Sequence, residues 1–279
     1  MATSGARSWV PKSSLIRGAV KPWHVLFLLG VSWAVSGVGA HKIAEHVAIE
    51  NRMAIRDMAV SAIGALIILA FTVIVPEFRR SLAVLFSRPS TRPTAADLSL
   101  ACAVTLCWGY GLYRVGTFLF LLVHPDAYQT LGFVESVGPL ELQFLVFWAG
   151  SVLVAPFAEE LIFRGYLLNL WAARWGIWPA VIVSSLVFGL VHWTQAVFAA
   201  PIGFVLALVY LRYDSLWPGI FLHAVYNFLA TPWVLGGYFY VKTQGSIGHV
   251  SQWMAEIVLA LLLVPIFFVF WRRFKPVAS

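Results

Sequence analysis

The sequence predicts an all-α membrane protein, a polytopic bundle of about eight transmembrane helices. Hydrophobic residues make up 61% of the 279 residues and charged residues only 11%, whereas soluble domains carry about 25% charged residues. Mean hydropathy is +0.84, and apolar runs near the roughly 20 residues needed to cross a bilayer recur along the chain. The basic residues cluster at the ends of these runs, so the net charge of +7 reflects the positive-inside pattern. We therefore expect the lipid bilayer as a partner, and no nucleic acid.

The N-terminal half is expected to hold a basic tail and three spans. Residues 1–21 resemble the basic start of a signal peptide, but the apolar run that follows is long enough to be retained as a span. The three expected spans are about 23–40, 58–76 and 98–123. The segment 77–97 is rich in Pro, Ser, Thr and Arg and is predicted to be a linker.

The C-terminal half is expected to hold five spans. The run 201–211 is short, so the stretch 179–211 forms either two short spans or one span and a re-entrant segment broken near Pro201. We assign residues 22–275 to a single membrane domain that follows the tail. The five expected spans are about 146–171, 179–195, 201–211, 216–235 and 254–271.

Both termini are expected on the cytoplasmic side of the membrane. Eight spans return the chain to the side on which it began, and most basic residues at the ends of the runs fall on that side. By the positive-inside rule this side is cytoplasmic. These basic residues are Arg7, Lys12, Arg17, Lys21, Arg79, Arg80, Arg88, Arg92, Arg174, Arg212, Arg272, Arg273 and Lys275.

Three charges lie inside one of the most apolar runs. Glu159, Glu160 and Arg164 fall within six residues, although a charge near the bilayer centre costs about 2.5–3.5 kcal/mol. The carboxylates could lie at a helix end, but the apolar pattern continues as far as Trp171, which places Glu159 roughly 18 Å from the cytoplasmic end of its helix. Glu160 and Arg164 are four residues apart and can form an ion pair, whereas Glu159 points about 100° away, toward a different neighbour.

Two further polar pairs lie in equally apolar surroundings. Phe188 and His192 are four residues apart, as are His223 and Asn227, so each pair shares one helical face. The helical rise puts His192 roughly 20 Å deep and the second pair roughly 10–17 Å deep. Taken singly, each pair is also compatible with a packing histidine or an interhelical hydrogen bond. Their depths are close to that of Glu159, and we expect the three sets to meet.

Such a set of side chains supports hydrolysis of an acyl centre such as a peptide bond. A glutamate and a histidine can deprotonate water, and a histidine and an asparagine can donate hydrogen bonds to a developing oxyanion, with no cofactor required. Alternatively, Glu159, His192 and His223 form a zinc ligand set with one open position, although the chain has no HExxH motif. A proton-coupled transporter also needs intramembrane glutamate and histidine, and this alternative stays open.

The three motifs together resemble a known family. Glu-Glu-xxx-Arg in APFAEELIFRGYLL, Phe-xxx-His in FGLVHW and His-xxx-Asn in FLHAVYN occur in this order, each in its own apolar segment. This arrangement is similar to that of the CAAX prenyl endopeptidase and bacteriocin-processing family, also called CPBP or Abi. The similarity covers about residues 146–235, and residues 1–140 match nothing that we can identify.

The resemblance implies a glutamate-dependent intramembrane endopeptidase with an all-helical core of eight spans. Glu159 takes the water-activating role with help from His192, Glu160 and Arg164 support it, and the two residues of the third motif, His223 and Asn227, bind the oxyanion. Because some members of the family were called metalloproteases, the zinc alternative with Glu159, His192 and His223 as ligands carries over.

The resemblance also implies a substrate class and a location. We expect a membrane-bound peptide or protein substrate, lipidated or anchored through its C-terminus, and a place in the bacterial plasma membrane. Other relatives act in bacteriocin maturation or immunity, so a non-catalytic membrane protein of the immunity type is a second alternative to the protease.

Overall fold

The structure is a computed structural model that describes residues 10–12, 20–45, 52–112, 148–192, 196–229 and 250–276, with the single residues 115, 119 and 123. Every regular element in these ranges is a helix, which confirms the all-α prediction. The elements are α2 (Pro22–Glu45), α3 (Arg52–Ile74), α4 (Pro76–Leu85), α5 (Ala95–Leu106), η1 (Cys107–Leu112), η2 (Gly150–Val154), α9 (Ala155–Glu160), η3 (Leu161–Leu168), α10 (Asn169–Trp175), α11 (Ile177–Val191), α12 (Ala196–Tyr213), a helix over 216–229 and α14 (Val250–Phe274).

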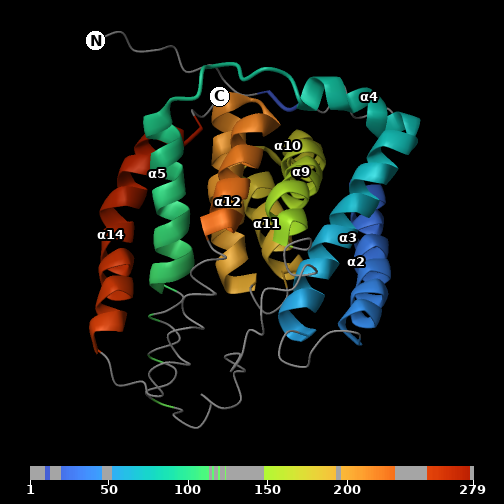
Figure 1. The fold of residues 1–279 in the computed structure, drawn as a ribbon. Coiled ribbons are helices and arrows are strands. Elements are labelled where there is room, and N and C mark those ends of the chain that lie inside the picture. The colour runs from blue at the N-terminus through green and yellow to red at the C-terminus, as the bar shows by residue number, and fades with distance from the viewer. Residues whose placement is uncertain are drawn as a thin grey trace.

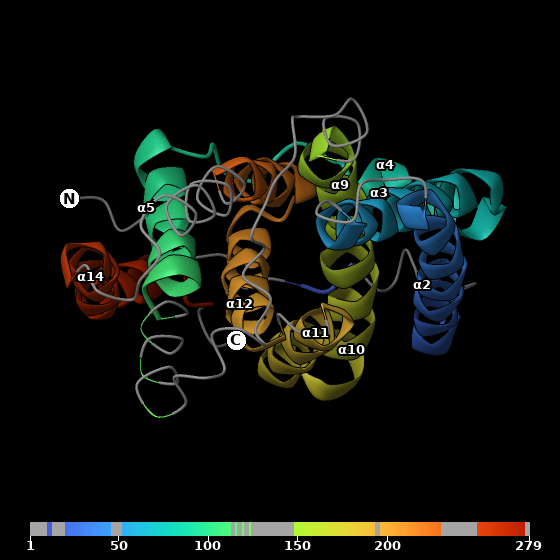
Figure 2. The ribbon, with the colours of Figure 1, turned by 60° about the horizontal axis from the view of Figure 1, so that its bottom comes forward.

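The three motifs lie in the middle of the molecule. Figure 1 shows α2 and α3 on one flank and α5 and α14 on the other, with α9 to α12 between them, and the view in Figure 2 shows the same order. The closest packing joins α2 with α3, α11 with α12, and α14 with η1. The central helices contain the large buried side chains, among them Phe163, Tyr166, Phe188 and Tyr210.

The flanking helices present apolar side chains outward, as expected for contact with lipid. Trp23, Phe27 and Trp33 of α2 and Val264 and Phe268 of α14 are all more than half exposed. Exposing such a surface to water would be unfavourable, because removing apolar surface from water stabilises a protein by about 25 cal/mol per Å². Together with the composition, these apolar helices identify a membrane protein.

The number of spans is only partly defined by the described residues. Two helices, Pro22–Ile43 and Ile257–Phe274, are long and apolar enough to cross a membrane, and a third span results if Ala59–Ile74 and Pro76–Leu85 are counted as one. Other apolar helices in the described ranges, such as Ile177–Val191, are shorter. Part of the expected span 98–123 lies outside the described residues. The expected number of about eight spans therefore stays a prediction.

The predicted linker over 77–97 is wrong in its first half, because α4 occupies residues Pro76–Leu85. The helix starts with Pro76 in its first turn, where a missing N–H costs nothing, and with Glu77 near the positive end of the helix dipole. Phe78, Ser81 and Leu85 form its buried side. The sharp bend of 100° after α3 lays α4 across the end of the bundle, and a true loop follows over 86–94.

Three of the basic residues that were expected on one side lie at one end of the bundle. Arg273 at the end of α14 and Arg212 at the end of α12 both pair with Asp97 at the start of α5, at 2.7 Å and 3.9 Å. Lys12 of the tail lies against the end of α4, where its ammonium contacts the Val84 carbonyl. The clustering agrees with the positive-inside pattern, and its cytoplasmic orientation stays a prediction.

Candidate active site

The two glutamates lie in a helix with an irregular backbone. Residues 148–175 run as one continuous helix, in which the short α-helical segment α9 is flanked by the π-helical segments η2 and η3. Pro156 has no N–H to donate, and the N–H of Ala155 reaches back five residues to the Gly150 carbonyl. Such π turns widen a helix and change the direction of its side chains, which is why they are frequent at functional sites.

Glu160 is fully buried and held by two charged or polar partners. Its Oε1 accepts hydrogen bonds from Arg164 Nη1 at 2.7 Å and from His223 Nδ1 at 3.1 Å. Arg164 also donates from Nη2 to the Gly203 carbonyl at 2.8 Å. The predicted ion pair of Glu160 and Arg164 is thus present, with both side chains no more than 1% exposed.

Gly219 makes room for the second oxygen of Glu160. A Cβ at position 219 would lie 3.0 Å from Glu160 Oε2, closer than an ordinary carbon–oxygen contact. This Oε2 has no hydrogen-bond partner in the part of the chain that the structure describes. The helix over 216–229 can therefore approach Glu160 because residue 219 has no side chain.

Glu159 faces two histidines. Its Oε2 lies 3.8 Å from His192 Nε2 and 3.7 Å from His223 Nε2, too far for direct hydrogen bonds. The same oxygen is buried and has no hydrogen-bond partner among the described residues. Glu159 and His192 are partly open, with side chains 20% and 30% exposed, so a substrate can reach this side of the cluster.

Both histidines present the same ring nitrogen to Glu159. His192 Nδ1 is 2.7 Å from the Phe188 carbonyl, and because a carbonyl only accepts, Nδ1 carries the proton. His223 Nδ1 donates to the carboxylate of Glu160 in the same way. In the neutral ring of His192, Nε2 is then a lone-pair acceptor, whereas Nε2 of His223 becomes a donor when that ring carries a second proton. These atoms border one small space, which suits a bound water molecule that donates one O–H to Glu159 Oε2 and the other to His192 Nε2.

Phe188 packs against both histidines and the arginine. Its ring centre lies 4.5 Å from that of His192 and 5.9 Å from that of His223, and the Arg164 guanidinium carbon lies 4.7 Å above the ring. Phe163 closes the other edge at 5.0 Å. An aromatic face favours a nearby cation, so Phe188 orients the histidines and supports Arg164 without adding a titratable group.

The structure brings five of the six predicted residues into one connected cluster. These are Glu159, Glu160, Arg164, His192 and His223. The sixth, Asn227, lies one turn beyond His223 and donates from Nδ2 to the Ser151 carbonyl at 2.9 Å. This contact ties the helix over 216–229 to η2, so Asn227 borders the cluster rather than joining it.

Sequence reasoning missed three positions that shape the site. Gly203 contributes a carbonyl, Ser151 contributes another, and Gly219 contributes space. A backbone acceptor is the same in every residue type, and a close approach of two helices depends on the whole packing. The only local signal was a glycine inside each of two apolar helices, where glycine lowers helix stability and needs a reason.

The zinc alternative does not match the geometry of the described residues. Among them, no group of three or more His, Cys, Asp and Glu side chains is arranged to hold a metal ion. The distances of Glu159 Oε2 to the two Nε2 atoms are longer than the roughly 3.4 Å expected between tetrahedral ligands at 2.0–2.1 Å from zinc.

The family model that matches this chain is that of the Rce1-like family, described as type II CAAX prenyl endopeptidase Rce1-like. The match covers residues 141–229. This is less than half of the chain, and it includes all three motifs. The resemblance inferred from those motifs is therefore confirmed.

Two curated proteins are similar to part of this chain. "Putative membrane peptidase YdiL" of Bacillus subtilis (strain 168) is 32% identical over 104 residues, which are 37% of this chain and 41% of that protein. "UPF0177 protein YbdI" of Lactococcus lactis subsp. lactis (strain IL1403) is 29% identical over 131 residues, which are 43% of this chain and 68% of that protein. This chain thus spans less than half the length of the first relative. No solved structure gives a significant match.

Proposed function

We propose that this protein is an intramembrane endopeptidase that hydrolyses a peptide bond with a water molecule activated by Glu159. The observation that carries the proposal is the convergence of Glu159 Oε2 with the Nε2 atoms of His192 and His223. A buried carboxylate oxygen without a hydrogen-bond partner in the described structure is rare in proteins and calls for an explanation. A water held between these three atoms supplies one.

The hydrolysis follows the general acid–base scheme. The water oxygen attacks the carbonyl carbon while one of its protons passes to Glu159, with His192 Nε2 orienting the water. The electron pair of the C=O bond moves to the oxygen and forms the oxyanion. When the tetrahedral intermediate collapses, the C–N bond breaks and the proton on Glu159 moves to the leaving nitrogen.

We assign the oxyanion to the side of His223 and Asn227. With both ring nitrogens protonated, His223 keeps its Nδ1–H on Glu160 and presents Nε2–H to the oxyanion. In that form the formal charges of Glu159, Glu160, Arg164 and His223 sum to zero, which lowers the cost of burying them. Asn227 lies one turn beyond His223 on the same helix and donates from Nδ2 to the Ser151 carbonyl.

The substrate that we propose is a CAAX-type peptide, in which a prenylated cysteine is followed by three residues. The description of the matched family and the exposed apolar helices α2 and α14 support a membrane-anchored substrate that reaches the site from the lipid. In this proposal the central helices belong to an eight-span core, and the basic end of the bundle faces the cytoplasm.

The test uses the full chain, purified and reconstituted in liposomes, with a fluorogenic S-farnesyl CAAX peptide and its unprenylated counterpart. Glu159→Gln is expected to lower kcat by about 10³-fold or more, since it removes the base. Glu77→Gln, a glutamate exposed on α4, is the matched control and is expected to leave kcat unchanged. Exhaustive chelation is expected to leave the wild type active, and a loss restored by zinc would overturn the metal-free scheme.

Two outcomes would overturn the proposal. One is cleavage by Glu159→Gln at the wild-type rate. The other is proton-coupled flux of a solute into the liposomes with no cleaved product from either peptide, which would favour a transporter. Cleavage of only the unprenylated peptide would keep the peptidase and reject the CAAX specificity.

A further inference from the structure

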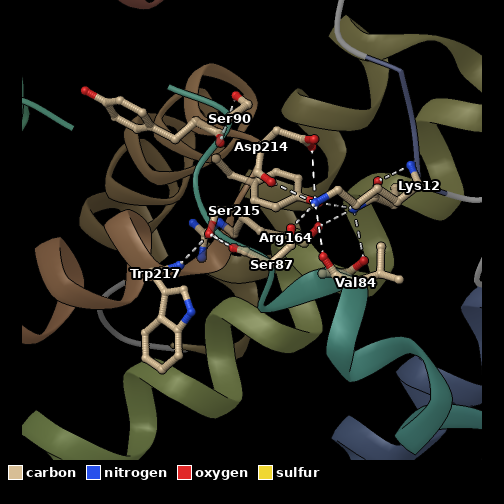
Figure 3. Close-up of polar contacts among 12 residues, drawn as sticks. Lys12, Val84, Ser87, Ser90, Arg164, Asp214, Ser215 and Trp217 are labelled. Carbon is tan, nitrogen blue, oxygen red and sulfur yellow. Dashed lines mark hydrogen bonds and ion pairs between the residues drawn. The ribbon is translucent and has the colours of Figure 1, made fainter. Parts of the chain in front are cut away.

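Lys12, in the tail that precedes the first span, is bound deeply at the basic end of the bundle. Its side chain is only 10% exposed. The Nζ ammonium donates to the carbonyl oxygens of Asp214 at 2.7 Å and Val84 at 3.3 Å and to Ser87 Oγ at 3.4 Å, and lies 3.3 Å from Asp214 Oδ1. Figure 3 shows Lys12 pointing into this group of oxygens, between the end of α4 and the turn at Asp214.

The turn that Lys12 contacts positions the helix over 216–229. Asp214 joins the end of α12 to this helix and has a φ of +50°, in the left-handed region, which residues with a Cβ enter only at a cost. Lys12 Nζ contacts both the backbone carbonyl and the side-chain carboxylate of this one residue. The ammonium thus stabilises a strained turn that sets the direction of the helix with His223 and Asn227.

The backbone of Lys12 binds the other half of the site through Asn169. The Lys12 N–H donates to Asn169 Oδ1 at 2.8 Å. Asn169 in turn donates from Nδ2 to the carbonyls of Arg164 at 2.8 Å and Gly165 at 3.0 Å, while its own backbone N–H goes to the Tyr166 carbonyl. Asn169 therefore satisfies carbonyls of the π-helical segment η3, directly after the Glu160–Arg164 pair.

We propose that Lys12 is a positioning residue for the candidate active site. One tail residue, far outside the segment that matches the family, fixes both the turn before the helix over 216–229 and the carbonyls of η3. These two elements carry His223 and Arg164, which meet at Glu160 Oε1. The inference deepens the proposed function, on which its kinetic test rests.

The first test compares Lys12→Met with Lys21→Met, an exposed lysine of the same tail, using the farnesylated peptide assay. Lys12→Met is expected to lower kcat by about 10-fold to 100-fold, the effect of a misplaced catalytic group, with KM nearly unchanged. Lys21→Met is expected to stay within about twofold of the wild type. A wild-type kcat in Lys12→Met would overturn the inference, whereas full activity in Glu159→Gln would overturn the proposed function instead.

A second variant separates positioning from simple loss of stability. Glycine enters the left-handed region without a steric cost, so Asp214→Gly relaxes the turn that Lys12 stabilises. The double variant Lys12→Met, Asp214→Gly is expected to recover at least about half of the lost activity on a logarithmic scale, because the two changes act on one turn. A double variant no better than Lys12→Met would contradict the role of the turn.

A third measurement does not need cleavage. Two hydrogen bonds at the same turn do not involve Lys12, namely Ser215 Oγ to the Ser87 carbonyl and Trp217 Nε1 to the Phe86 carbonyl. Lys12→Met is therefore expected to fold. In hydrogen–deuterium exchange, Lys12→Met is expected to speed exchange in 161–169 and 210–219 and to leave α2 unchanged. Equal exchange in wild type and variant at both segments would overturn the inference even if no peptide is cleaved.

Discussion

The clusters around Asp97 and around Glu159 are both made of buried carboxylates and basic groups, but they differ in one respect. Asp97 is saturated, which means that each of its carboxylate oxygens has a partner. Oδ1 pairs with Arg273 at 2.7 Å, and Oδ2 accepts a hydrogen bond from Tyr213 at 3.1 Å. Glu159 Oε2 is just as hidden from solvent and has no hydrogen-bond partner in the described structure. The comparison indicates that an unsatisfied oxygen, more than the presence of charge, distinguishes a reactive cluster from a structural one.

The same contrast separates two neighbours in the sequence. Glu160 is intermediate, because Arg164 and His223 hold its Oε1 while its Oε2 has no hydrogen-bond partner among the described residues. Glu159 differs from both, since its contacts are 3.7 Å or longer. Saturated positions are then expected to affect folding, and unsaturated positions are expected to affect the reaction.

The largest effect on stability is expected at Arg164. Arg164→Met leaves the buried Glu160 carboxylate without its cation, and breaking a buried ion pair in this way destabilises a protein by about 3–5 kcal/mol. Thermal unfolding in detergent measures the change. In the double variant Arg164→Met, Glu160→Gln the loss is expected to be smaller, because the uncompensated charge is gone. Equal losses of stability in the single and double variants would show that an uncompensated charge on Glu160 is not the cause.

A mainly kinetic effect is expected at Asn227. Asn227→Ala removes a candidate oxyanion donor and is expected to lower kcat by about 10²-fold to 10³-fold. The lost hydrogen bond to Ser151 costs about 1 kcal/mol of stability. Steady-state kinetics and thermal unfolding on the same preparation separate the two effects. A fall in unfolding temperature with an unchanged kcat would show that Asn227 stabilises the fold and takes no part in the reaction.

The smallest effect is expected at Asp97. Its partners Arg273 and Arg212 are 50% and 40% exposed, and exposed ion pairs contribute about 1 kcal/mol or less. Asp97→Asn is therefore expected to lower the unfolding temperature slightly and to leave kcat unchanged. A large loss of activity in this variant would show that saturation does not mark a structural cluster.

The sequence was sufficient for the parts of the fold and the site that depend on local pattern. The apolar runs predicted helices, and the spacing of Glu160 and Arg164 predicted their ion pair, because a helix brings residues four apart together. The meeting of Glu159, His192 and His223 followed from depth estimates of roughly 10–20 Å along straight helices. These quantities need no knowledge of neighbouring segments.

The remaining features depend on contacts between distant segments. The Pro, Ser, Thr and Arg content of 77–97 indicated a linker, but Phe78 and Leu85 are buried against the core and make α4 a helix. The position of Asn227 against Ser151 depends on the π turn in η2, for which the only local cause is Pro156. The sequence did not indicate the buried position of Lys12. A lysine in a basic tail is expected to be exposed to water, whereas the side chain of Lys12 is only 10% exposed.

Gly219 has a consequence for how this protein tolerates mutation. Every replacement of a glycine adds at least a Cβ, and here that atom would lie 3.0 Å from the carboxylate of Glu160. Conservative and radical substitutions therefore begin with the same close contact. A position with no side chain thus leaves little freedom for sequence change, although it takes no part in the chemistry.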